Sequence, residues 1–274
     1  MNGSAAVRPR KRFGQHFLHD PGAIQRILRA INPKPSQQWV EIGPGLGAIT
    51  FPLLVAVKRL DVVELDRTLI PHLQERAQAE DGDLCIHNAD ALNFDFAGLR
   101  RTDQPLHVVG NLPYNIATPL LFHLLNQLPA IADMHFMLQK EVVDRLAAGP
   151  RQSAYGRLSV MVQYRCRVEP LFTLGAGAFR PPPKVESAFV RLIPHTQPPV
   201  DIINEQHFAL LVRSAFGQRR KTVRNTLRGL LDEAALVTLG VAPSARPETL
   251  GLAEFAALSN YYSEATGANL SKSL

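Results

Sequence analysis

Cysteine is scarce in this sequence of 274 residues, which contains only two. Cys85 and Cys166 each lie inside an apolar segment, so we expect two buried free thiols rather than a disulfide framework. The nine histidines do not follow the spacing of metal ligands. The sequence therefore predicts no metal site.

Long apolar runs are also missing. No run approaches the roughly 18 residues that a membrane-spanning helix needs, and residues 1–12 lack the apolar core of a signal peptide. We therefore expect a cytoplasmic protein with no membrane segment. Hydrophobic residues make up 46% of the chain and charged residues 20%, which is typical of a folded soluble protein and excludes disordered and fibrous classes. The net charge of +6 favours a polyanionic partner, nucleic acid first.

The order of apolar segments predicts an α/β fold. Asp20 and Pro21 mark the start of a helix over residues 21–31, as N-cap and first helical residue. Short apolar runs separated by helix-length stretches then predict parallel strands in a doubly wound sheet. These runs lie at residues 39–42, 60–63, 84–86, 106–109 and 135–138. Residues 155–167 favour a helix, and residues 185–193 predict a strand that closes the sheet.

Three parts of the chain are expected. Residues 1–20 form a basic arm, residues 21–196 form the α/β domain, and residues 200–274 form a small helical domain after a linker at 196–199.

A glycine-rich turn follows the first predicted strand. Gly43, Gly45 and Ala48 lie between a strand and a helix, where glycine lets the backbone approach a ligand closely. By itself the turn fits a nicotinamide enzyme nearly as well as a methyltransferase, and a purely structural turn is the third alternative.

Acidic residues end the next two strands. Glu64 lies about 20 residues after the first glycine, where a carboxylate can accept hydrogen bonds from both ribose hydroxyls of a nucleoside. The alternative is a surface carboxylate paired with Arg67. Asp90 follows the third strand and can accept a hydrogen bond from an adenine amino group, or else cap a helix.

The tetrapeptide Asn111, Leu112, Pro113, Tyr114 directly follows the fourth strand. The N6 lone pair of adenine is delocalised into the ring, so this nitrogen attacks poorly until acceptors hold its hydrogens. The Asn111 side-chain oxygen and the Leu112 carbonyl supply two acceptors, because Pro113 biases Leu112 toward an extended conformation. Tyr114 offers a ring on which a flipped base can stack. The alternative is an ordinary turn with a core tyrosine.

Phe179 precedes a run of three prolines, which stiffens the loop around its ring. We expect Phe179 to form the second face of a base sandwich. A hydrophobic plug in the core is the alternative.

Basic residues dominate residues 206–229, where no acidic residue lies between Glu205 and Asp232. On a helix, Arg220, Arg224 and Arg228 would form one cationic stripe beside an apolar face. Together with Lys221 they predict an RNA-binding surface. The alternative is a solvated face.

With these residues in hand, the chain resembles the bacterial small-subunit (16S) ribosomal RNA adenine N6,N6-dimethyltransferase family. The resemblance covers nearly the whole chain. It rests on KRFGQHFLHD at 11–20, VEIGPGLG at 40–47, VELD at 63–66, NLPY at 111–114, QKE at 139–141, FRPPPKV at 179–185 and AFGQRRKTVRNTL at 215–227.

The resemblance implies a Rossmann-like class I methyltransferase domain with a small C-terminal all-helical domain. It implies S-adenosylmethionine as cofactor, and as substrate two adjacent adenosines in the 3′-terminal hairpin of small-subunit rRNA. A partly assembled 30S particle is the expected partner, and naked RNA is the alternative. The resemblance also implies that His16 and Leu18 contact the cofactor, which leaves open whether His16 does so through its side chain or its backbone. The remaining cofactor residues correspond to Gly43, Glu64, Asp90 and Asn111.

Two competing functions remain. One is a large-subunit rRNA adenine methyltransferase of the antibiotic-resistance type, against which the segment at 215–227 argues. The other is an RNA-binding assembly or transcription factor that keeps the fold without the activity, against which the intact glycine turn, Glu64 and the tetrapeptide argue.

Overall fold

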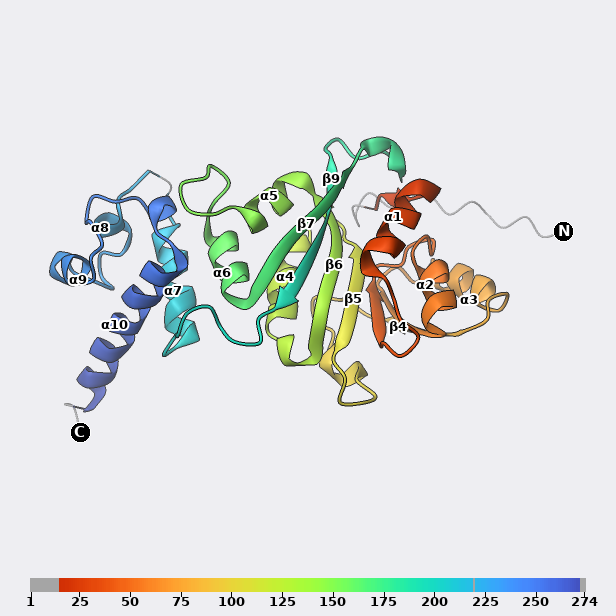
Figure 1. Ribbon diagram of the computed structural model, residues 1–274, viewed down its shortest axis with the longest axis horizontal. Helices are drawn as coiled ribbons and strands as arrows, with labels where there is room; N and C mark the ends of the chain where they lie inside the picture. The colour runs from red at the N-terminus through yellow and green to blue at the C-terminus, as the bar shows by residue number, and fades with distance from the viewer. Residues whose placement is uncertain (1–14, 219, 272–274) are drawn as a thin grey trace. The chain divides into compact units, whose positions relative to one another are not determined.

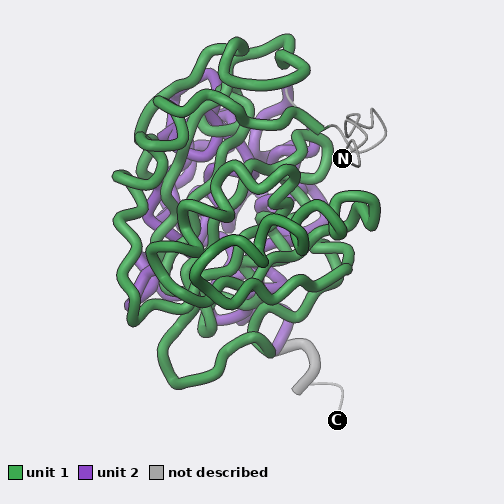
Figure 2. Tube along the Cα trace, turned by 90° about the vertical axis from the view of Figure 1, so that its right-hand side faces the viewer, with its two compact units in different colours: residues 1–143, 169–194 green, residues 144–168, 195–274 purple. Residues whose placement is uncertain are grey.

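The computed structural model describes residues 15–218 and 220–271. These residues form two compact units, coloured green and purple in Figure 2. The first unit contains the described residues up to 143 together with Glu169–Pro194, and the second contains Asp144–Val168 together with the described residues from 195 onward. The basic residues expected in the N-terminal arm, at positions 8–12, lie outside the described part of the chain.

A seven-stranded sheet organises the first unit, in the order β4, β3, β2, β5, β6, β9, β7 (Figure 1). The strands from β4 to β6 are parallel, and β9 is antiparallel to β6. Every parallel strand expected from the apolar runs is present, so the prediction of a doubly wound, mostly parallel α/β sheet is confirmed. The bounds are β2 (Trp39–Ile42), β3 (Arg59–Glu64), β4 (Asp83–Asn88), β5 (Leu106–Asn111), β6 (Ile131–Gln139), β7 (Cys166–Leu174) and β9 (Ser187–Pro194).

The edge strand differs from the prediction. The expected strand at residues 185–193 is present as β9, but it does not close the sheet, because β7 lies beyond it. Sequence reasoning missed β7 because it is mostly exposed or half-buried and contains Arg167, Glu169 and Pro170, so it lacks an apolar run. Proline is compatible with an edge strand, where one side of the backbone needs no partner.

Helices α1 (Pro21–Ile31) and α2 (Thr50–Val57) contribute to one apolar cluster with residues of β2 and β3. The helix predicted at 21–31 is confirmed, and Asp20 caps it by accepting a hydrogen bond from the Ala23 amide at 2.6 Å. The unit also contains α3 (Ile70–Ala77) and α4 (Ala117–Leu125), the short pair β1 (Phe17–Leu18) and β8 (Phe179–Arg180), and the 3-10 turns η2 (Ala97–Leu99), η3 (Leu128–Ala130) and η4 (Ala176–Ala178).

The second unit is helical, as predicted for the C-terminal part. It contains α6 (Arg157–Arg165), α7 (Glu205–Ala215), α8 (Val223–Thr226), α9 (Glu233–Thr238), η5 (Pro247–Thr249) and α10 (Leu252–Ser271), while α5 (Lys140–Ala147) spans the boundary. The expected single domain over 21–196 is therefore wrong for residues 144–168. The reason is packing: Tyr164 of α6 lies against Phe208 of α7, at 5.1 Å between ring centroids. Within residues 15–218 and 220–271, no helix combines the length and apolar character that crossing a membrane requires.

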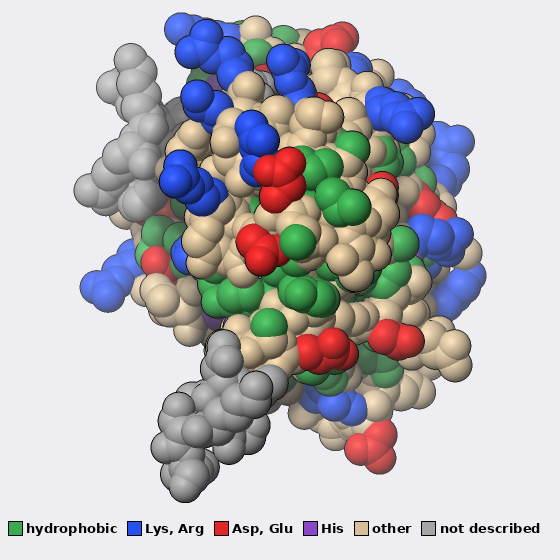
Figure 3. Space-filling view, turned by 90° about the vertical axis from the view of Figure 1, so that its left-hand side faces the viewer, with side chains coloured by type: hydrophobic (Ala, Val, Ile, Leu, Met, Phe, Trp, Pro, Cys, Tyr) green, Lys and Arg blue, Asp and Glu red, His purple; other side chains and the backbone are tan. Residues whose placement is uncertain are grey.

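The expected cationic helix in the second unit is not formed. Helix α8 spans only Val223–Thr226, so Arg220 and Arg228 lie outside it and cannot form a stripe with Arg224 along one helix. Arg224 also forms an ion pair with Glu233 of α9 at 3.3 Å. Glu233 lies just beyond the interval without acidic residues on which the prediction rested. Arg220, Lys221, Arg224 and Arg228 are nevertheless all exposed. Figure 3 views the side on which α8 and α9 lie in Figure 1, and Lys and Arg side chains gather along its upper part.

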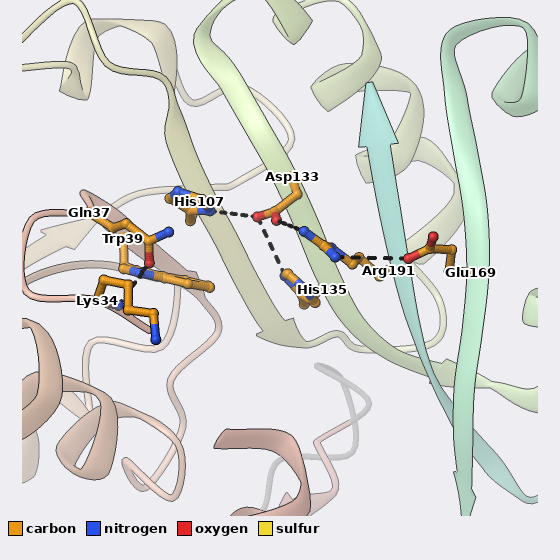
Figure 4. A network of polar contacts seen from close by, with 8 residues as sticks. All are labelled: Lys34, Gln37, Trp39, His107, Asp133, His135, Glu169 and Arg191. Atoms are coloured by element: carbon orange, nitrogen blue, oxygen red, sulfur yellow. Dashed lines mark hydrogen bonds and ion pairs between the residues drawn. The ribbon is translucent and has the colours of Figure 1, made fainter. Parts of the chain in front are cut away.

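A polar network lies near the amino ends of the central strands (Figure 4). Asp133 of β6 accepts hydrogen bonds from His107 of β5 at 2.7 Å and from Arg191 of β9 at 2.7 Å. The His107 ring stacks on Trp39 at 4.8 Å between centroids. His135 is 1% exposed, and its Nδ1 lies 3.6 Å from Asp133 Oδ1, the contact drawn in Figure 4. This is too long for a hydrogen bond, and neither ring nitrogen has a hydrogen-bond partner in the described part of the chain.

These contacts shift two pKa values in the network. Burial raises the pKa of Asp133, but the hydrogen bond from His107, the charge of His135 and the bond from Arg191 outweigh it and lower the pKa to about 2. Burial lowers the pKa of His135 to about 4, although the nearby Asp133 carboxylate opposes this shift. His135 is therefore neutral in the folded protein at neutral pH.

We expect His135 to make stability depend on pH. In the unfolded chain His135 is protonated below its usual pKa of 6.5, whereas in the folded chain it is protonated only below about pH 4. The free energy of unfolding therefore falls as pH falls through this interval. The loss attributable to His135 is about 3 kcal/mol. Chemical unfolding of wild type and His135→Phe at several pH values measures it. An equally steep pH dependence in His135→Phe would contradict this assignment, and the exposed His19→Gln is the control.

Candidate active site

A cavity of about 300 Å³ lies at the carboxyl ends of β2, β3 and β5. Its walls come from five segments of the first unit: residues 15–18, the glycine turn after β2, the end of β3, residues 89–92 and residues 111–116. Ligands of open α/β sheets bind at this edge, where neighbouring strands end together. The volume is at the lower end of the range for small-molecule sites.

The glycine turn forms one wall of the cavity. Gly43 has φ +68° and Gly45 has φ +58°, in the left-handed region that favours glycine. A Cβ atom on Gly43 would meet no atom within 4 Å, so the backbone here faces open space. The Gly45 amide donates a hydrogen bond to Glu64 Oε2 at 3.2 Å, which ties the turn to the end of β3. The turn can therefore present its backbone to a ligand.

Glu64 lines the cavity and is 6% exposed. Its Oε1 accepts a hydrogen bond from the Asp66 amide at 2.8 Å, and burial raises its pKa while the backbone hydrogen bonds oppose the shift. Each carboxylate oxygen can accept two hydrogen bonds, so both keep capacity for ribose hydroxyls. The alternative pairing with Arg67 is not formed, since the Arg67 guanidinium donates to Asn88 instead.

Asp90 also lines the cavity. Its carboxylate accepts a hydrogen bond from the Leu92 amide at 3.0 Å, and a turn rather than a helix follows it. The alternative of a helix cap is therefore wrong. A contact between Asp90 and an adenine amino group stays a prediction.

Sequence reasoning missed Glu41. This residue of β2 lines the cavity, is 2% exposed and accepts a hydrogen bond from the Thr50 hydroxyl at 2.5 Å. Burial raises its pKa to about 8, so the carboxyl group is largely protonated at neutral pH. The sequence does contain a signal for Glu41, since an acidic residue two positions before Gly43 lies inside a strand that is expected to be buried.

Asn111 ends β5 and faces the same cavity. Its Nδ2 donates a hydrogen bond to the His16 backbone carbonyl at 2.8 Å. Because the amide nitrogen is engaged there, the side-chain oxygen is the atom left to accept hydrogens from a substrate. Leu112 and Pro113 line the cavity beside it, and the Leu112 amide continues the sheet by donating to Met137. Asn111 and Leu112, the residues predicted to supply the two acceptors, therefore both line the cavity, and their contact with a substrate stays a prediction.

Tyr114 completes this wall. Its hydroxyl is hydrogen-bonded to Ser187 Oγ at 2.7 Å, and burial raises its pKa. Its ring stacks on the His16 ring, with centroids 5.5 Å apart. The neighbouring Leu18 is 6% exposed and lines the cavity too. Both residues of the N-terminal motif therefore line the cavity, and their contact with the cofactor stays a prediction.

Phe179 is not part of the cavity lining. It is 2% exposed and packs in the apolar core with residues such as Ile27, Leu174 and Phe189. Its strand partner is Leu18. In this structure Phe179 therefore lies where the alternative, a hydrophobic plug, places it, and its contact with a target base stays a prediction.

Potential metal ligands come together once within the described residues, at Asp61, Cys85 and His87. Asp61 is hydrogen-bonded to His87 at 2.9 Å and paired with Arg101. The Asp61 charge is therefore already compensated by protein groups. The cluster does not line the cavity described above.

Comparisons with known proteins agree with this geometry. A family model described as ribosomal RNA adenine dimethylase matches residues 6–264. The chain belongs to the ribosomal RNA adenine dimethylase family. A ribosomal RNA small subunit methyltransferase A from Nitrosococcus oceani is 58% identical over 260 residues, which cover 94% of this chain and 97% of that protein. A protein of the same name from Pseudomonas putida is 56% identical, covering 95% and 97%.

Solved structures confirm the class I methyltransferase fold of this dimethylase family member. A dimethyladenosine transferase from Plasmodium falciparum superposes with a TM-score of 0.79 at 26% identity, covering 92% of this chain and 98% of that one. The 23S rRNA methyltransferase ErmE superposes with a TM-score of 0.68 at 25% identity, covering 90% and 99%.

Substitution of Glu64 tests the ribose contact. We expect Glu64→Ala to weaken binding of S-adenosylhomocysteine by about 1 to 3 kcal/mol, because it removes charge-assisted hydrogen bonds. The affinity of Glu64→Gln, which keeps one acceptor, should lie between those of wild type and Glu64→Ala. Isothermal titration calorimetry measures the affinities and thermal unfolding checks the fold. Substitution of the exposed Glu75 in α3 by Ala is the control. Unchanged affinity for S-adenosylhomocysteine in a folded Glu64→Ala protein would contradict the assignment of Glu64 to the ribose.

Proposed function

We propose that this protein is an S-adenosylmethionine-dependent methyltransferase that dimethylates N6 of two adjacent adenosines in the 3′-terminal hairpin of small-subunit rRNA. The observation that carries the proposal is the Asn111 amide, whose nitrogen is engaged by His16 and whose oxygen is left to accept in the cavity of the glycine turn and Glu64. Family membership and the names of relatives that are 53–58% identical support the RNA substrate.

The cavity fits the cofactor at three points. Gly43 leaves open space over its backbone, Glu64 offers carboxylate oxygens for the ribose, and Asp90 offers an acceptor at the adenine end. When bound, S-adenosylmethionine supplies an electrophilic methyl group on a positively charged sulfur. The protein needs no metal for this chemistry, because the leaving sulfur becomes neutral as the methyl group departs.

The chain's own residues prepare the nucleophile. The Asn111 side-chain oxygen and the Leu112 carbonyl accept hydrogens from the target amino group, which favours a tetrahedral N6 with a localised lone pair. Tyr114 holds the base by stacking. With the cofactor bound, the bond from N6 to carbon would form as the bond from sulfur to carbon breaks, and N6 would then lose one proton to solvent. One hydrogen remains after the first transfer, so a second transfer can follow, and positioning provides most of the rate enhancement.

The competing functions are less well supported. ErmE, which acts on 23S rRNA, is 25% identical to this chain, whereas the small-subunit relatives are 53–58% identical. A role in RNA assembly without activity would not require the glycine turn, Glu64 and Asn111 to converge on one cavity. The proposed setting is the cytoplasm, with a partly assembled 30S particle as the partner.

Mapping of methyl groups tests the function. Wild-type protein, labelled S-adenosylmethionine and small subunits from cells that lack the modification are incubated together, and mass spectrometry then locates the label. We expect dimethylated adenosine at two adjacent positions of the 3′-terminal hairpin. Label confined to large-subunit rRNA, or no label, would overturn the proposal.

We expect Asn111→Ala to lower the single-turnover methyl-transfer rate by on the order of 100-fold, the typical effect of losing one preorganised hydrogen bond to the transition state. RNA binding should survive, because the change removes no charge. Rapid-quench measurement at saturating cofactor tests this, and a near-normal rate would refute the acceptor role. Exposed Asn225→Ala in α8 is the matched control.

The second unit offers the surface for RNA phosphates, even without a cationic helix. We expect replacement of Arg220, Lys221 and Arg228 together by Gln to weaken RNA binding and to flatten its salt dependence by about 0.7 to 0.9 log units per lost phosphate contact. Arg224→Gln alone should matter less, since Arg224 pairs with Glu233. Titrations at several salt concentrations measure both, and an unchanged slope in the triple variant would show that RNA docks elsewhere.

A further inference from the structure

Three side chains with different metal-binding chemistry meet on one face of the sheet, outside the lining of the cavity. Asp61 of β3 lies directly opposite Cys85 of β4, and His87 follows two residues later on the same face of β4. The carboxylate, thiol and imidazole donor atoms all lie within 4.8 Å of one another. The sequence gives no spacing signal for this group, because Asp61 joins it only through the pairing of the two strands.

The group is enclosed on one side and reachable from solvent on the other. The Asp61 side chain is 4% exposed, whereas the His87 side chain is 28% exposed and Cys85 is half-buried. A small ion can therefore reach the group past His87 and Cys85. Asp61 offers a carboxylate in a poorly hydrated position, where attraction to a cation is stronger than in water.

Arg101 is the cation that accompanies Asp61 in this structure. Its guanidinium pairs with Asp61 Oδ2, while Asp61 Oδ1 is hydrogen-bonded to His87 Nε2 at 2.9 Å. The Arg101 side chain is 33% exposed, and its backbone is held separately, since the Arg101 amide donates to the Gln38 side chain at 3.1 Å. The guanidinium can therefore turn into solvent while the backbone of Arg101 stays in place.

We propose that Asp61, Cys85 and His87 form a binding site for a thiophilic divalent ion of the zinc type, in which the ion takes the place of the Arg101 guanidinium. Thiolate, imidazole and carboxylate are the three kinds of ligand that Zn²⁺ takes from proteins, and a water molecule would complete a tetrahedral set. Ca²⁺ and Mg²⁺ are poor occupants, because they prefer oxygen ligands. The inference does not depend on the proposed methyltransferase activity.

The exchange is balanced in charge and small in distance. The Cys85 thiol would lose its proton to solvent, so one thiolate and one carboxylate would neutralise the two charges of the ion, as Arg101 now neutralises Asp61. Ligand atoms around a tetrahedral zinc ion lie about 3.5 Å apart, so donor atoms that are within 4.8 Å have to approach by roughly 1 Å. Side-chain rotation can supply this movement without a change in strand pairing.

The position of the site determines its effect. Strand β4 is at the edge of the sheet and pairs only with β3, so an ion bound by both strands would brace this edge. Asp61 precedes Glu64 by three residues, which is about 10 Å along a strand. The ion would therefore stabilise the fold without contacting the cofactor cavity.

Titration of the reduced, full-length protein with Co²⁺ and Zn²⁺ tests the site. Co²⁺ replaces Zn²⁺ in such sites and gives a near-ultraviolet charge-transfer band when a thiolate binds it. We expect wild type to show this band together with the visible absorption of tetrahedral Co²⁺, and to lose both when Zn²⁺ is added. Competition with a chromophoric chelator measures the Zn²⁺ affinity, and Zn²⁺ should raise the thermal unfolding temperature.

Substitution of the thiol identifies the ligand. We expect Cys85→Ser to abolish the charge-transfer band and to weaken Zn²⁺ binding by about 100-fold or more, since loss of even an outer-shell partner of a ligand costs about 10- to 100-fold. Cys166→Ser is the matched control, because this second thiol is buried outside the group and its loss should leave the band unchanged. His87→Gln should weaken binding while the band persists at higher Co²⁺ concentration.

Substitution of the arginine tests the exchange itself. We expect Arg101→Gln to tighten Zn²⁺ binding by about 10-fold or more, because it removes a charge-assisted contact that competes for Asp61. Arg100→Gln is the control, since the Arg100 guanidinium donates to two backbone carbonyls instead of Asp61. A purely structural ion pair predicts no metal binding in any of these proteins.

Three results would overturn the inference. They are the absence of a charge-transfer band in reduced wild type, a band that persists in Cys85→Ser and disappears in Cys166→Ser, and a Zn²⁺ affinity of Arg101→Gln that is no higher than that of wild type. Thermal unfolding without metal verifies that each variant is folded, and His87→Gln replaces Cys85→Ser as the test if the latter does not fold. Methyl transfer in metal-free buffer is measured separately, so failure of this inference leaves the proposed function intact.

Discussion

Parallel pairing of β2 with both β3 and β5 is the constraint on which the cavity depends. Ile42 lies opposite Val63 and Glu41 lies opposite Val109, so the three strands end at one edge. The Gly43 amide extends the ladder by one bond to the Val63 carbonyl. A turn, a carboxylate and an amide that are far apart in the sequence therefore meet without any long loop to position them. The buried Glu64 then fixes the turn by accepting from Gly45.

The two ends of the sheet have different tasks. At the amino ends, Asp133 accepts hydrogen bonds from His107 and Arg191, which compensate its buried charge. At the carboxyl ends, Glu64 and Asn111 keep acceptor capacity facing a cavity. Buried polar groups are stabilising when fully bonded and are available for ligands when partly bonded. This division leaves the cavity end free to bind ligands while the opposite end holds the strands together.

Much of this arrangement could be predicted from the sequence, because the parallel strands are apolar on both faces and the polar residues that follow them stand out. The glycine turn, Glu64 and the tetrapeptide at Asn111 were found in this way. Features that depend on packing between residues far apart in the sequence could not be predicted from the sequence. Edge strand β7 has no apolar run, and Phe179, expected beside a base, packs in the core. Arg224 meets Glu233 only because the chain turns between α8 and α9.

The central claim is that one cavity at the carboxyl edge binds the cofactor and orients the Asn111 amide. A crystal structure of the protein with S-adenosylhomocysteine tests it most directly. The account predicts both ribose hydroxyls within hydrogen-bond distance of the Glu64 carboxylate, the amino-acid portion beside the glycine turn, and the Asn111 nitrogen still bonded to the His16 carbonyl. A nucleoside bound without contact to Glu64, or an Asn111 amide turned so that its oxygen faces away from the cavity, would contradict the account.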